Sequence, residues 1–79
     1  MIAEKLIRKN LDLTALYKKA EQYCKPVHHP AAFGFPTTFG FCFGDDSNLT
    51  ITADTDTDGN YRFTHARSYA RNNLIEVIA

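Results

Sequence analysis

Apolar side chains in the first 25 residues recur at the spacing of one helical face. At 3.6 residues per turn they form one stripe about 100° wide, as in a helix that packs on a core. The stripe contains Ile2, Leu6, Leu13, Leu16, Tyr17, Ala20 and Cys24. The pattern predicts one long helix over residues 2–25, ended by Pro26. A break near residues 10–12, with Asp12 as a second N-cap, is the alternative interpretation.

Residues 48–54 and 61–65 alternate apolar and polar side chains, as half-buried strands do. Asp58-Gly59 between them is a hairpin turn signal, and a three-residue loop of 57–59 would place Gly59 in the left-handed region. This loop keeps apolar residues on one face, whereas a two-residue loop would set Asp54 against Phe63. The predicted register pairs Thr55 with Tyr61, Asp54 with Arg62, Ala53 with Phe63, Thr52 with Thr64, Ile51 with His65 and Leu49 with Arg67.

The segment 33–43 contains five phenylalanines at odd positions, which one face of a strand would present together. Because Pro36 interrupts this run, we predict a strand only from Thr38 to Phe43. Residues 74–79 are rich in β-branched side chains and predict a last strand, while residues 68–73 fit either a strand or a short helix.

These elements predict one α+β domain over residues 1–79. It would consist of a helix (2–25), a connector (26–37) and an antiparallel β-meander of about four strands (38–79), with the helix on one sheet face. The open face, away from the helix, would carry small side chains. If Glu76 of the last strand points to this face, Leu74 and Ile78 lie there as well. Its predicted members are Gly40, Cys42, Thr50, Thr52, Ala66, Ser68, Ala70, Leu74 and Ile78.

The net charge is zero, but the charges are unevenly distributed. From Pro26 to Tyr61 there are five aspartates and no lysine or arginine, while the first 25 residues are mainly basic. We find no secretory leader and no apolar run long enough to span a membrane, so we expect a cytoplasmic protein without a membrane partner.

Two metal sites can be considered. Asp54, Asp56, Asp58 and Gly59 match the first half of a calcium loop, but position twelve is His65 where a glutamate is required. Zinc ligands are present in Cys24, His28, His29, Cys42 and His65, yet only Cys24 and His28 have ligand-pair spacing. The sequence therefore favours a hairpin over a calcium site, and we expect no metal and no cofactor.

The segment Thr38-Phe39-Gly40-Phe41-Cys42 resembles the centre of the aromatic strand motif of RNA-recognition domains. The resemblance covers three residues. Thr38 replaces the expected glycine, Gly44 stands at the last aromatic position, and a helix replaces the leading strand of that family. An aromatic core is the interpretation that the sequence favours for this segment.

Because no nucleophile, base and orienting group form a recognisable set, we expect a non-enzymatic protein-binding module. We expect an inhibitor or modulator that occludes a basic surface of a larger protein or ribonucleoprotein complex. Its acidic residues would mimic nucleic acid. Small size and polarised charge are similar in type to virus-encoded anti-defence proteins such as anti-CRISPR proteins, although no motif carries this likeness. The candidate partner-binding residues are Asp45, Asp46, Asp54, Asp56, Asp58, Ile7 and Leu11.

Two alternatives remain open from the sequence. One is a small nucleic-acid-binding module whose basic helix uses Lys5, Arg8, Lys9, Lys18 and Lys19. The other is a metal-binding regulatory protein.

Overall fold

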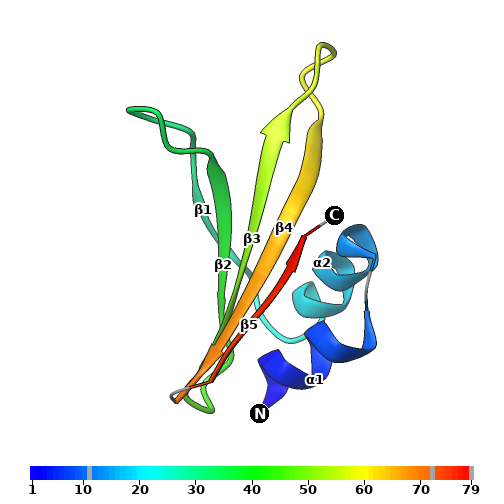
Figure 1. Cartoon of the computed structure of the whole chain (residues 1–79), viewed down its shortest axis with the longest axis vertical. Helices are drawn as coiled ribbons and strands as arrows, with labels where there is room; N and C mark the ends of the chain where they lie inside the picture. Colours follow the sequence, from blue (N-terminus) through cyan, green and yellow to red (C-terminus); the bar gives the residue numbers. More distant parts are fainter. Residues whose placement is uncertain (11, 72, 79) are drawn as a thin grey trace.

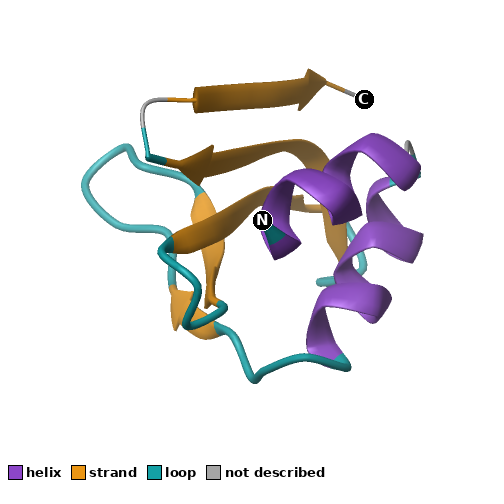
Figure 2. Cartoon of the chain, turned by 90° about the horizontal axis from the view of Figure 1, so that it is seen from below, coloured by secondary structure: helices purple, strands orange, loops and turns teal. Residues whose placement is uncertain are grey.

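The chain forms two layers, with two helices on one face of a five-stranded antiparallel sheet (Figures 1 and 2). The computed structural model describes residues 1–10, 12–71 and 73–78. Its elements are α1 (Ile2–Lys9), α2 (Leu13–Glu21), β1 (Val27–His29), β2 (Thr37–Cys42), β3 (Ser47–Thr55), β4 (Tyr61–Ala70) and β5 (Asn73–Ile78). The strands are neighbours in chain order. The small α+β fold with an antiparallel sheet is confirmed, but the prediction of one long helix and about four strands is wrong.

The predicted helix 2–25 is broken at Asn10, as in the alternative interpretation. The backbone of Asn10 is extended, and its side chain donates a hydrogen bond to the carbonyl of Leu6 at 3.0 Å. Asp12 then caps α2 by accepting a hydrogen bond from the Thr14 amide at 2.9 Å. Short polar side chains compete in this way for backbone groups, so they end one helix and begin the next.

The break lets each helix turn its own face toward the sheet. α1 buries Ala3, Leu6 and Ile7, while α2 buries Leu13, Leu16 and Ala20. Ile7 lies opposite the apolar stripe of a continuous helix, but it is only 1% exposed here. A helix of two turns can adjust its rotation independently, which a single long helix cannot do.

The predicted connector contains the first strand, β1. Val27 lies opposite Gly40, and His29 lies opposite Thr38. The meander therefore begins at residue 27 rather than 38. The prediction missed β1 because a strand of three residues between two prolines shows no recognisable alternation.

The β3–β4 hairpin confirms the predicted loop and the outer half of the register. Asp54 lies opposite Arg62 and Ala53 opposite Phe63. The amide of Asp56 donates to the carbonyl of Asn60 at 2.9 Å, which encloses the loop 57–59. Gly59 has a φ of 83°, the left-handed conformation expected for this turn.

A β-bulge between Thr52 and Ala53 shifts the inner half of this register by one residue. The predicted pairs there are wrong: Thr52 lies opposite His65 rather than Thr64, Ile51 opposite Ala66 rather than His65, and Leu49 opposite Ser68 rather than Arg67. The bulge points small residues of β4 toward the helices, so their predicted position on the open face is also wrong. Ala66, Ser68 and Ala70 are all buried.

The physical reason for the bulge is the polarity of β4. An unbroken register would point His65 and Arg67 into the core, where burying a charged group without a partner is costly. With the bulge, Arg67 reaches the open face and forms an ion pair with Glu76 at 3.2 Å. The core between the layers then consists of aliphatic residues and of Phe39 and Phe41, against which Tyr17 packs edge-on.

Candidate functional site

The predicted acidic residues lie at opposite ends of the sheet. In a meander alternate connections share an end, so the β1–β2 and β3–β4 connections are together and the β2–β3 turn is at the other end (Figure 1). Asp54, Asp56 and Asp58 therefore lie at one end, and Asp45 and Asp46 at the other. The five aspartates do not form a single acidic surface.

Asp45 binds the start of the first helix. Its carboxylate accepts a hydrogen bond from the Ile2 amide at 2.8 Å, and also binds the hydroxyl and the amide of Ser47. The hydroxyl of Ser47 in turn accepts from the Ala3 amide at 3.3 Å. The Ser47 hydroxyl, followed by the Ile2 amide, lowers the pKa of Asp45 below its ordinary value. This carboxylate joins α1 to the β2–β3 turn, which is a structural role.

Residues 56–60 form what we call the acidic tip. Asp56 organises it, because one carboxylate oxygen accepts from the amides of Asp58 and Asn60, each at 2.9 Å. At its base Arg62 donates to Asp54 at 2.8 Å and lowers the pKa of that carboxyl group. Within the described residues neither Asp56 nor Asp58 forms an ion pair. Both are exposed, so the acidic tip presents two carboxylates to solvent.

Residues 30–36 form a second projection, the aromatic tip. Ala32 and Phe35 exchange two backbone hydrogen bonds, of 3.2 and 2.9 Å, across a two-residue turn. Phe33 and Gly34 in that turn have φ angles of 52° and 82°, the pattern of a type I′ turn. Phe33 is 100% exposed and Phe35 is 75% exposed.

Phe33 adopts a backbone conformation that phenylalanine disfavours. Type I′ turns favour asparagine or glycine at both central positions, and a bulky residue with positive φ is an outlier. The shared odd numbering of the phenylalanines concealed this tip, because it grouped Phe33 and Phe35 with the residues of β2. The available signal was Phe33-Gly34 between Pro30 and Pro36, a segment too rich in turn residues to continue a strand.

An aromatic cluster on the helix side connects the bases of the two tips. The ring of His28 stacks on that of Phe39 with centroids 4.8 Å apart, and Tyr61 meets Phe39 edge-on at 5.4 Å. The hydroxyl of Tyr61 lies 3.4 Å from Nε2 of His28. Because Phe39 is buried between these residues of β1 and β4, the cluster fixes the spacing of the tips.

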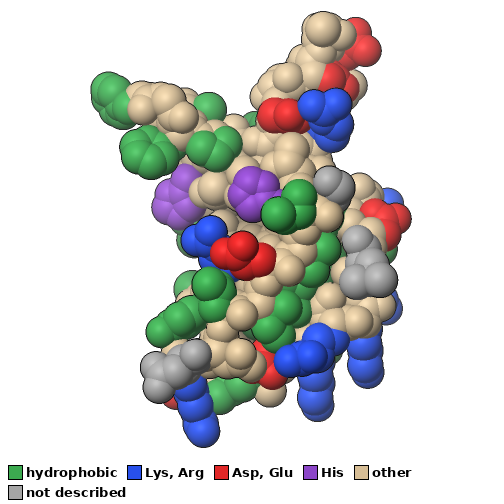
Figure 3. Space-filling view, viewed as in Figure 1, with side chains coloured by type: hydrophobic (Ala, Val, Ile, Leu, Met, Phe, Trp, Pro, Cys, Tyr) green, Lys and Arg blue, Asp and Glu red, His purple; other side chains and the backbone are tan. Residues whose placement is uncertain are grey.

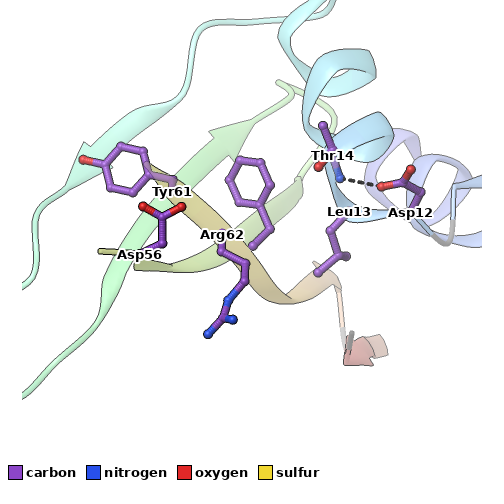
Figure 4. Close-up of a pocket in the computed structure, with 7 residues that line it drawn as sticks. Asp12, Leu13, Thr14, Asp56, Tyr61 and Arg62 are labelled. Atoms are coloured by element: carbon purple, nitrogen blue, oxygen red, sulfur yellow. Dashed lines mark hydrogen bonds between the residues drawn. The ribbon is translucent and has the colours of Figure 1, made fainter. Parts of the chain in front are cut away.

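A hollow of about 440 Å³ lies beside the acidic tip, between the first turn of α2 and the start of β4. Its lining consists of Asp12, Leu13, Thr14, Asp56, Tyr61, Arg62 and Phe63. Figure 4 shows Asp12, bonded to Thr14, on the opposite side of the hollow from Asp56. The guanidinium of Arg62 in the lining is paired with Asp54, so the carboxylates of Asp12 and Asp56 leave the hollow net negative, which suits a basic side chain.

The remaining predicted residues lie elsewhere. Ile7 is in the core and is not available to a partner, and Leu11 lies outside the described residues. The candidate nucleic-acid residues are all exposed on the helices, away from the sheet: Lys5, Arg8, Lys9, Lys18 and Lys19. Blue side chains project from the lower part of the molecule in Figure 3.

The candidate metal ligands are not brought together. Among residues 1–10, 12–71 and 73–78, no three histidine, cysteine, aspartate or glutamate side chains lie close enough to hold a metal ion. Cys24 and Cys42 are both free thiols. The hairpin interpretation of the aspartate-rich segment is confirmed, since strands flank it on both sides.

Comparison of the chain with protein-family models, with curated proteins and with solved structures gives no match. Neither of the two described helices has the length and apolar character needed to cross a membrane.

Proposed function

We propose that this protein is a non-enzymatic docking module that occupies a surface of a larger protein or ribonucleoprotein complex. The docking end is the sheet end that carries the aromatic and acidic tips. The observation that supports it best is Phe33, a fully exposed phenylalanine held in left-handed backbone. Such an arrangement costs stability, and strained residues cluster where they serve binding.

The chemistry of the two tips describes the partner surface. The aromatic tip belongs to a segment, residues 26–44, that contains no aspartate, glutamate, lysine or arginine, so it suits an apolar pocket. Asp56 and Asp58 belong to the β3–β4 connection at the same end of the sheet, and they suit a basic border around that pocket. The hollow beside the acidic tip would receive a lysine or arginine of the partner. An acidic tip of this kind also competes with nucleic acid for a basic channel.

An anionic membrane is a less suitable partner for this end. Exposed aromatic residues do enter lipid interfaces, but anionic lipids attract basic segments and repel carboxylates. The acidic tip would approach the lipid together with the aromatic tip. A protein surface with an apolar pocket and basic border satisfies both tips at once.

The test begins with capture of partners by a tagged copy, followed by binding measurements with the purified partner. Phe33→Ser with Phe35→Ser should weaken binding by about 2 kcal/mol or more, as loss of buried aromatic anchors does. Asp56→Asn with Asp58→Asn should slow association and remove most of its salt dependence. Asp46→Asn is the matched control, because it makes the same change on an exposed aspartate at the other end.

The outcomes distinguish this proposal from its alternatives. Unchanged binding in both double variants would refute the docking end. Binding to vesicles of phosphatidylcholine and phosphatidylserine, lost with the two phenylalanines, would identify a membrane instead. Binding to a labelled oligonucleotide that is lost when Lys5, Arg8 and Lys9 are replaced by glutamine would support the nucleic-acid module.

A further inference from the structure

The two edge strands of the sheet differ in how they are protected. β1 has three residues and lies between Pro26 and Pro30, which have no amide hydrogen to offer a further strand. β5 has six residues, contains no proline and pairs with β4 alone among the described elements. Natural sheets usually shield an edge by shortening it or by adding proline or charge. β1 follows this rule and β5 does not.

The side chains of β5 also do little to prevent another strand from pairing with its edge. Leu74 and Ile78 are 50% and 79% exposed on the open face, beside Tyr69 of β4, which is 45% exposed. The only charged residue of β5 is Glu76, and Arg67 of β4 neutralises it at 3.2 Å. An unpaired strand that is apolar and carries no net local charge is a template for another strand.

We propose that β5 pairs antiparallel with β5 of a second copy of this chain, which forms a continuous ten-stranded sheet about a two-fold axis at Glu76. A two-fold axis perpendicular to the sheet keeps corresponding faces on the same side, so open-face residues meet open-face residues. With the axis at Glu76, Leu74 of one copy lies opposite Ile78 of the other. On the helix side Ile75 lies opposite Val77.

In this register the two Glu76 carboxylates lie opposite each other and repel, so their ion pairs with Arg67 matter to the dimer. The two Glu76 residues meet at the axis, and each has Arg67 of its own copy on its far side. This gives a row of arginine, two glutamates and arginine across the sheet, in which each arginine offsets the repulsion between the two central carboxylates. An axis at Ile75 would instead set Leu74 against Glu76, an apolar residue against a carboxylate. Self-pairing at Glu76 is therefore the register in which the apolar residues match.

The layers leave room for this pairing. The helices cover one sheet face and do not extend beyond the outer side of β5 in the view of Figure 2. In the dimer both helix layers would lie on the same side of the sheet. Antiparallel pairing would direct the tips of the two copies in opposite directions, away from the dimer interface. The dimer proposal therefore does not depend on what the tips bind.

The test is the mass of the purified chain in sedimentation equilibrium over micromolar concentrations. The wild type should approach twice the monomer mass. Leu74→Lys with Ile78→Lys places lysines opposite each other and should return the protein to monomer. Leu74→Lys with Ile78→Glu places each lysine opposite a glutamate of the other copy and should restore the dimer, although it too replaces two apolar residues with charged ones.

Val27→Lys is the control, since it replaces one exposed apolar residue of the opposite edge with lysine. It should leave the dimer unchanged. Circular dichroism would show whether each variant keeps the native fold. If the double lysine variant does not fold, the masses of the lysine–glutamate variant and of Val27→Lys still test whether β5 forms the dimer interface. A monomeric wild type, or a dimer that Val27→Lys abolishes, would overturn the proposal, and so would a folded, monomeric lysine–glutamate variant.

Discussion

The two tips at one end of the sheet both contain tight turns, but they differ in how well their residues suit the turn. In the acidic tip, Gly59 takes the left-handed position and Asp56 binds the turn amides, so each residue suits its conformation. In the aromatic tip, Phe33 takes a left-handed position that favours asparagine or glycine. Local turn chemistry therefore explains the acidic tip completely. Local turn chemistry does not explain Phe33 in the aromatic tip, and this is why we propose docking for it.

The largest expected effect contrasts a phenylalanine at the base of the tips with one at the end. Phe39 is 7% exposed and contacts the rings of His28 and Tyr61. Phe39→Ala should lower the free energy of unfolding by about 3–5 kcal/mol, through lost burial and the cavity left behind. Phe33→Ala should change it by less than about 0.5 kcal/mol, because the side chain packs on nothing. Urea denaturation measures both, and equal losses would show that the aromatic tip is part of the core.

A second experiment compares the glycines of the two tips. Gly34 and Gly59 have φ angles of 82° and 83°, and an added methyl group would meet nothing within 4 Å at either position. Alanine should therefore destabilise each variant by about 1–2 kcal/mol through the backbone alone. Gly40→Ala is the control, since Gly40 lies in β2 without positive φ. A negligible loss at either tip in thermal melts would mean that its turn is not fixed as described.

The third prediction concerns the conformational cost of Phe33. Phe33→Asn places a preferred residue in the type I′ turn and should stabilise the protein by about 0.5–1 kcal/mol. The same variant should bind the partner more weakly, because the aromatic anchor is lost. Thermal melts and partner titration measure the two effects. A destabilised variant would show that Phe33 contributes to the fold, contrary to its exposure.

The smallest effect concerns the electrostatic support of the acidic tip. Arg62 holds the pKa of Asp54 below its ordinary value of 3.8, so the pair contributes stability above that value. The contribution is lost as the pH falls through the lowered pKa. Asp54→Asn should therefore lower the melting temperature slightly near neutral pH and not at strongly acidic pH. Asp46→Asn, which removes no ion pair, should show no such dependence.

The sequence alone determined the features that depend on neighbouring residues. Strict alternation and Asp58-Gly59 fixed the strands and loop of the β3–β4 hairpin, because turn type and period act within a few residues. Helical periodicity identified Leu6, Leu13 and Leu16 as core residues for the same reason. The acidic tip follows from this local information.

Only the tertiary structure decided the features that depend on distant contacts. Asp45 is a structural residue because it meets Ile2, which is 43 positions away in the chain. The bulge opposite Thr52 arises because it lets β4 bury Ala66 in the core and leave Arg67 exposed. Ile7 is buried because two short helices rotate separately against a twisted sheet. The position of the aromatic tip depends on β1, which pairs with β2 and also contacts Tyr61 of β4 through His28. Such outcomes depend on packing between segments, for which a single sequence contains no periodic signal.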